Sequence, residues 1–297
     1  MTGSKFKGII YILLGALIFG FAPILVKLSF EGGGNGITMV FLRSAIGLPF
    51  LAVIMIIKKI PFKIPKAMGK EILIAGAFGY GLTAILLNLS YNYIDVSLAV
   101  TLHYINPVLV MLGCSVIFRE KLGSLKWIAL AMGMTGIVFL LEAVHTVSLL
   151  GITLSFLSGV SCAFYIIYLG LSNLKKLHFF TVTFYLCLIQ GILAFGLGIA
   201  TGDLTFNLTA MAWTYATIIA VMITIFGVTF FQLGIIHAGP PTASMVATLE
   251  PITSIVFGAI ILSETLTIFR ITGGFLIVLS VVVIAISERN HTVSNQE

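Results

Sequence analysis

The chain has 297 residues, of which 59% are hydrophobic and only 9% are charged, and its mean hydropathy is +1.17. A water-soluble domain of this size could not keep such a surface in solution, so the composition excludes that class and indicates an integral membrane protein. The net charge of +6 does not indicate nucleic-acid binding, because the lysines cluster in short segments between apolar runs, as membrane topology requires.

Long apolar runs follow one another along the chain. Residues 72–94, 96–118 and 177–202 contain no Asp, Glu, Lys or Arg, and each exceeds the roughly 20 residues that cross a hydrocarbon layer. The uncharged run 204–249 is too long for one helix, and a Gly-Pro-Pro sequence at residues 239–241 divides it. The sequence therefore predicts ten spans, at about residues 8–29, 36–57, 71–93, 97–118, 124–142, 149–172, 178–200, 210–236, 241–262 and 268–287.

The lysines and arginines predict the orientation of these spans. With the N-terminus inside, every one of the 16 basic residues except Lys27, Arg43 and Arg270 falls on the cytoplasmic side. This is a strong positive-inside bias. An even number of spans returns the C-terminus to the same side, so we expect both termini inside and a multi-pass protein of a bacterial-type plasma membrane.

The two halves of the chain carry the same pattern. Prolines at positions 107 and 251, which are 144 residues apart, each lie midway along an apolar run, and a glutamate follows each proline thirteen residues later. Internal similarity of this kind indicates duplication. Five spans fall in each half, and because five is odd the second half must cross the membrane in the opposite sense. We expect an all-α membrane fold of two inverted five-helix repeats, residues 1–145 and 146–297.

On these motifs the chain resembles the drug/metabolite transporter superfamily, in particular its EamA-type members. The resemblance covers nearly the whole chain and rests on Pro107 with Glu120-Lys121-Leu122, and on Leu249-Glu250-Pro251 with Glu264-Thr265-Leu266. It implies that the first, third, fourth, sixth, eighth and ninth helices surround a central cavity, while the fifth and tenth pack at an edge. It does not name a solute, because members are reported to carry amino acids, nucleobases, sugars, cofactors and drugs.

Glu250 and Arg43 are the charged residues expected well inside the membrane. Glu250 lies about nine residues, or roughly 14 Å, into its span, where a carboxylate must be paired, hydrated or protonated. Arg43 lies about seven residues, or roughly 10 Å, into the second span, and a guanidinium can clamp a carboxylate. Binding of a substrate or a proton is one interpretation; a structural ion pair between the two residues is the other.

The fourth span offers three further polar candidates. His103 could change charge near neutral pH, although a lone histidine is more often a hydrogen-bonded structural residue. Tyr104 and Asn106 follow it directly before the proline. Asn106 departs from the serine or small residue of many EamA first repeats, so we expect it to shape the cavity.

Two amides and three aromatic residues complete the candidate site. Asn88 and Gln232 occupy equivalent positions in the third and eighth spans, where bonding between helices is the default expectation and a role in the cavity is the alternative. Phe19, Tyr80 and Tyr165 fall on helices expected to face the centre. An aromatic lining would suit amphipathic solutes or organic cations.

Motifs for catalysis and for nucleotide binding do not occur in the sequence. We therefore expect no catalytic residue, no metal and no cofactor. Cys114, Cys162 and Cys187 lie in apolar runs without a pairing pattern, and we expect buried reduced thiols.

The sequence favours a secondary transporter of small organic solutes that works by alternating access. Its expected partners are a small-molecule substrate and the lipid bilayer, with coupling to protons or to exchange and no nucleic acid; a homodimer is left open. Opposite charges on Glu250 and Arg43 favour export of an amino acid or a related metabolite. Uptake of an organic cation or a vitamin-like compound is the alternative, and a membrane-embedded enzyme or scaffold is the alternative from another class.

Overall fold

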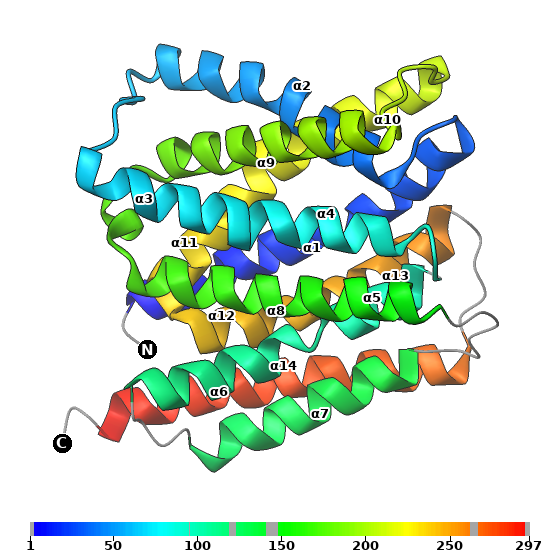
Figure 1. The fold of residues 1–297 in the computed structure, drawn as a ribbon. Coiled ribbons are helices and arrows are strands. Elements are labelled where there is room, and N and C mark those ends of the chain that lie inside the picture. The colour runs from blue at the N-terminus through cyan, green and yellow to red at the C-terminus, as the bar shows by residue number, and fades with distance from the viewer. Residues whose placement is uncertain (1–2, 95, 119–122, 141–147, 262–266, 295–297) are drawn as a thin grey trace.

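The computed structural model describes residues 3–94, 96–118, 123–140, 148–261 and 267–294, and within these ranges every regular element is a helix (Figure 1). In chain order the elements are α1 (Gly3–Glu31), α2 (Gly36–Ile57), α3 (Lys66–Ile74), η1 (Ala75–Gly81), α4 (Leu82–Ser90), α5 (Val96–His103), α6 (Asn106–Phe118), α7 (Ser124–Leu140), α8 (Leu149–Leu171), η2 (Asn173–Lys176), α9 (Phe179–Thr201), α10 (Ala210–Val221), η3 (Met222–Gly227), α11 (Val228–Ala238), α12 (Pro240–Val246), η4 (Ala247–Leu249), α13 (Glu250–Ile261) and α14 (Ile268–Ser294).

The helices have the length and the surface of a membrane protein. Within the described residues, seven continuous helical segments are long and apolar enough to cross a bilayer, and three shorter apolar helices accompany them. Their outer faces carry large apolar side chains: Ile57, Val116 and Ile199 are 74%, 77% and 63% exposed. Lipid is the solvent in which such faces are stable. The all-helical membrane class is thus confirmed, while the ten-span inverted repeat and the side of the termini stay predictions.

The helices pack side by side around α1. Helix α1 lies against α11 and α13, α2 lies against α9, and α4 lies against α8. Helices α7 and α14 pack mainly on each other and form one edge of the molecule (Figure 1). This edge position agrees with what the resemblance implied for the fifth and tenth helices.

Both motif prolines coincide with an interruption of their helix. Before Pro107 the helix opens into a turn at residues 104–105 that separates α5 from α6, and before Pro251 it tightens into the 3₁₀ turn η4. Proline has no N–H for the carbonyl oxygen four residues earlier and its ring crowds that carbonyl, which explains why both breaks lie directly upstream. The glutamates at positions 120 and 264, which complete the sequence motifs, lie outside the described residues.

Two π-helical segments interrupt long helices in the described part of the bundle. Segment η1 divides the helical segment of residues 66–90, and η3 divides the helical segment of residues 210–238. Each wider turn changes the face that the following residues present, and such turns occur frequently at functional sites. Tyr80, one of the residues singled out in the sequence, lies within η1.

The close contact of α1 with α13 yields a stability prediction. A Cβ atom at Gly20 would lie 2.5 Å from the carbonyl oxygen of Glu250 and 2.5 Å from Cβ of Thr253. Gly20→Ala should therefore destabilise the protein by about 1–3 kcal/mol through overpacking. The measurement is the melting temperature of the purified protein in detergent.

Gly196→Ala is the matched control, because no described atom lies within 4 Å of a Cβ there. On α9 this substitution should be neutral or stabilise by up to about 1 kcal/mol, since alanine favours the helix. Equal melting temperatures for the two variants would contradict the packing described for Gly20.

Candidate functional site: a polar cavity between helices

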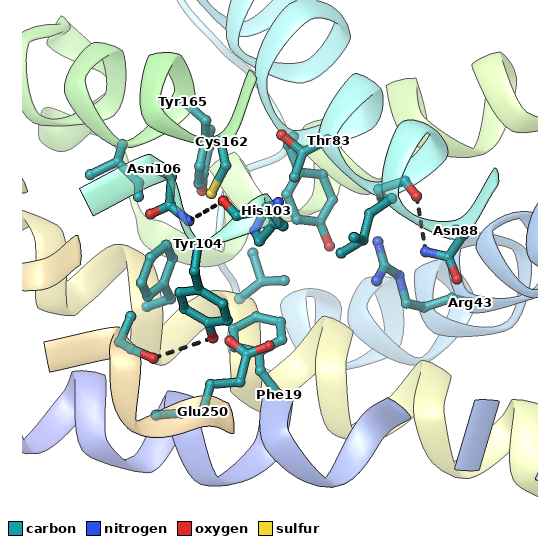
Figure 2. A pocket seen from close by; sticks show the side chains of 18 residues that line it. Phe19, Arg43, Thr83, Asn88, His103, Tyr104, Asn106, Cys162, Tyr165 and Glu250 are labelled. Atoms are coloured by element: carbon teal, nitrogen blue, oxygen red, sulfur yellow. Dashed lines mark hydrogen bonds between the residues drawn. The ribbon is translucent and has the colours of Figure 1, made fainter. Parts of the chain in front are cut away.

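A cavity of about 150 Å³ lies among the helices (Figure 2). Its lining comes from α1, α2, η1, α4, α5, α6, α8, α11, η4 and α13, and most of the lining side chains are apolar or aromatic. The structure brings nine of the ten predicted site residues to this cavity: Phe19, Arg43, Tyr80, Asn88, His103, Tyr104, Asn106, Tyr165 and Glu250.

Arg43 lies at one side of the cavity and is held by an aromatic ring. Its guanidinium carbon lies 5.6 Å from the centroid of the Tyr80 ring, within the range of a cation–π interaction. Its Nε atom is buried and has no hydrogen-bond partner in the described part of the chain. The arginine therefore keeps unused donor capacity inside an apolar environment.

Glu250 lies at the opposite side, as the first residue of α13 (Figure 2). It directly follows the 3₁₀ turn η4, within the continuous helical segment Pro240–Ile261. Its side chain lies beside Tyr104, which is 3% exposed and donates its hydroxyl proton to the carbonyl oxygen of Ala247 at 3.4 Å.

Arg43 and Glu250 line the same cavity without contacting each other. Among the described residues they form no ion pair, and the two side chains are well separated in Figure 2. The structural ion pair that the sequence left open is therefore absent from this conformation. The physical reason is that Arg43 lies over the Tyr80 ring, whereas Glu250 follows the break before α13 on the far side of the cavity.

Three further polar lining residues form hydrogen bonds to the protein. His103 Nδ1 lies 2.9 Å from Ser158 Oγ, and Asn106 donates from Nδ2 to the carbonyl oxygen of His103 at 3.1 Å. Asn88 donates from Nδ2 to Ala84 of its own helix at 2.9 Å, so this bond does not join two helices. These bonds orient the polar edges of the cavity.

Gln232 is the predicted site residue that the cavity does not include. It is 1% exposed and donates from Nε2 to Thr183 Oγ1 at 3.0 Å, a bond from α11 to α9. Asn88, at the equivalent position in the first half, lines the cavity. Equivalent positions in the two halves therefore have different surroundings. Bonding between helices, the default expectation for both amides, holds for Gln232 alone.

Cys162 is a lining residue that sequence reasoning assigned to the buried thiols. Cys114 and Cys187 are 3% and 0% exposed, whereas Cys162 is half-buried and faces the cavity. Its spacing from Tyr165 and Ile166, at i, i+3 and i+4, places all three on one helix face. That spacing was the signal available in the sequence.

The thiols yield a test of the cavity's accessibility. N-ethylmaleimide applied to the purified protein should modify Cys162 well before Cys114 or Cys187, because Cys162 alone of the three lines the cavity. Peptide mass spectrometry over a time course measures each site, with Cys162→Ser as the control. Equal modification rates at the three cysteines would contradict the described cavity.

Comparisons with known proteins agree with this architecture. The model of the EamA-like transporter family matches residues 6–142 and again residues 149–286. A solved crystal structure with 15% sequence identity superposes with a TM-score of 0.79 and covers 95% of this chain and 98% of its own. At that identity the likeness shows the fold alone.

Several curated relatives are transporters by name. An uncharacterized transporter of Archaeoglobus fulgidus is 26% identical over 84% of this chain and 88% of its own length. A second uncharacterized transporter from that organism is 26% identical over 92% of this chain and 94% of its own length. An uncharacterized transporter of Synechocystis sp. is 24% identical over 66% of this chain and 61% of its own length. The chain is thus a multi-pass membrane transporter of small solutes, and it belongs to the EamA-like transporter family.

Proposed function

We propose that the protein is a secondary transporter that moves a small organic solute by alternating access through the cavity between Arg43 and Glu250. The observation that carries this proposal is that residues of both family-model matches enclose one cavity, which is lined by a basic and an acidic side chain that do not pair with each other. Ionisable residues inside a membrane protein are costly and mark solute or ion pathways.

Reciprocal contacts support the two inverted repeats that alternating access requires. Thr224 Oγ1 donates to the Arg43 carbonyl oxygen at 3.5 Å, and Cys187 Sγ lies 3.9 Å from Tyr80 Oη. Adding 144 to Arg43 and Tyr80 gives Cys187 and Thr224, so the two contacts exchange under that offset. A two-fold axis produces such pairs of contacts.

A second reciprocal pair lies at the edge formed by α7 and α14. A Cβ at Gly133 would lie 3.2 Å from Ser280 Oγ, and a Cβ at Gly136 would lie 2.7 Å from Cγ1 of Ile277. The same offset of 144 relates Gly133 to Ile277 and Gly136 to Ser280. The contacts therefore support a pseudo-two-fold axis in the membrane plane.

The opposite charges favour export of an amino acid or a related metabolite. A zwitterion has a partner for Arg43 and a partner for Glu250, whereas an organic cation would leave the guanidinium unmatched. Uptake of an organic cation remains the second candidate, because Phe19, Tyr80 and Tyr104 line the cavity and aromatic faces attract cations. Proton coupling or solute exchange would supply the energy.

Glu250→Gln tests the role of the cavity carboxylate. It should reduce transport in proteoliposomes by about tenfold or more, because a charge-assisted hydrogen bond is lost, while the protein still inserts and purifies as a folded species. Glu31→Gln is the matched control, since Glu31 is exposed and lies outside the cavity. Wild-type flux in the Glu250 variant would contradict the proposal.

The proposed orientation predicts which loops an impermeant reagent reaches. Lys63 and Asp203 are both exposed and lie between helices. With the N-terminus inside, an impermeant maleimide added to intact cells should label Asp203→Cys but not Lys63→Cys. The unsubstituted chain gives the background labelling. The reverse pattern would overturn the proposed orientation.

A further inference from the structure

The cavity keeps two opposite charges apart in an environment where they would attract strongly. Attraction between unit charges rises several-fold when water is replaced by a protein interior, yet Arg43 and Glu250 do not pair in this conformation. Arg43 is instead held over the Tyr80 ring. The separation of the charges is therefore a built feature of the site, and a solute that satisfies both must span it.

The Arg43 side of the cavity suits a carboxylate. The buried Nε of Arg43 lacks a partner among the described residues, and a buried donor without a partner is costly. A planar carboxylate can accept from Nε and a terminal nitrogen of the guanidinium together. The cation–π contact with Tyr80 holds the guanidinium beside the cavity, so Tyr80 acts as a positioning residue.

The Glu250 side suits an ammonium group. The carboxylate begins α13 and lies beside Tyr104 at the opposite side of the cavity (Figure 2). Asn106 and His103, which line the same region, already use one polar atom each in bonds to the protein. Glu250 is the acidic side chain among the described lining residues, so it is the group that would bind a cation here.

The volume limits the length of the solute. The cavity of about 150 Å³ equals the size of an apolar cavity that takes up benzene, and it is well below the roughly 300 Å³ at which sites for drug-sized ligands begin. The segment between the two charged groups of the solute must therefore be short. Because Phe19, Leu87 and Val228 also line the cavity, that segment must be apolar.

We propose, resting on the transport function proposed above, that the cavity selects ω-amino acids: solutes whose carboxylate and ammonium stand at opposite ends of a short apolar chain. The carboxylate binds Arg43 and the ammonium binds Glu250. An α-amino acid carries both groups on one carbon, so it can occupy one side of the cavity well but not both sides.

Isomer pairs test this directly, because they differ in charge separation alone. Binding of β-alanine and alanine, γ-aminobutyrate and α-aminobutyrate, and δ-aminovalerate and norvaline is measured on the purified protein and by counterflow in proteoliposomes. In at least one pair the ω-isomer should bind about tenfold or more tightly, as expected for one additional charge-assisted contact. Pentylamine and pentanoate, which carry one charge each, should bind as weakly as norvaline.

Charge-removing variants separate recognition from folding. Arg43→Gln should lower the affinity for the favoured ω-isomer to that for pentylamine, and it should leave the affinity for pentylamine unchanged. Glu250→Gln should lower the affinity for the same isomer to that for pentanoate, and it should leave the affinity for pentanoate unchanged. Arg43→Lys should retain part of the affinity that Arg43→Gln loses. Lys58→Gln and Glu31→Gln, at exposed positions outside the cavity, are the matched controls and should keep the isomer preference.

The outcomes distinguish this inference from the function on which it rests. If α-isomers or singly charged solutes bind and move as well as ω-isomers, the inference is overturned and the transport function stands. If the ω-isomers neither bind nor move while a wider panel of metabolites yields another transported solute, the inference is likewise overturned and the transport function stands. If proteoliposomes move no solute from either panel, the proposed function itself fails.

Discussion

A charge inside a membrane has no bulk water to stabilise it, and this constraint shapes the centre of the molecule. Arg43 meets it through a cation–π contact with Tyr80, and Glu250 meets it by lying beside the hydroxyl of Tyr104. Each residue obtains partial stabilisation without consuming its charge on the other. Under the proposed function the cavity offers both side chains to a solute, which a protein that simply paired them could not do.

The breaks and wide turns of the backbone make this arrangement possible. The helix opens into a turn before Pro107 and tightens into the 3₁₀ turn η4 before Pro251, and Tyr104 and Glu250 lie on the cavity wall at these breaks. The π-segment η1 carries Tyr80, which lies beside the arginine. The 144-residue offset relates the two proline breaks, yet Asn106 stands where the second half has Glu250. Similar breaks in the two halves thus carry different side chains, so the acidic side chain of the cavity comes from the second half alone.

Much of the helix placement and of the candidate site could be predicted from the sequence, because hydropathy and proline affect the chain close to where they occur. The apolar runs placed the helices, and the rarity of charge within them singled out Arg43 and Glu250. The partners of those charges could not be predicted, since they depend on how each helix is rotated in the bundle. Asn88 and Gln232 illustrate this: the same position in each half faces the cavity in one case and Thr183 in the other. The π-turns, which alter that rotation, leave no simple signature in the sequence.

Protection of Cys162 by a transported solute tests the central claim most directly, because this thiol lines the cavity between the two charges. A solute that the protein moves in proteoliposomes should slow alkylation of Cys162, at the concentration that half-saturates transport, and should leave Cys114 and Cys187 unaffected. Alkylation of Cys162 at an unchanged rate under saturating solute would contradict the account, since it would place the transport site elsewhere.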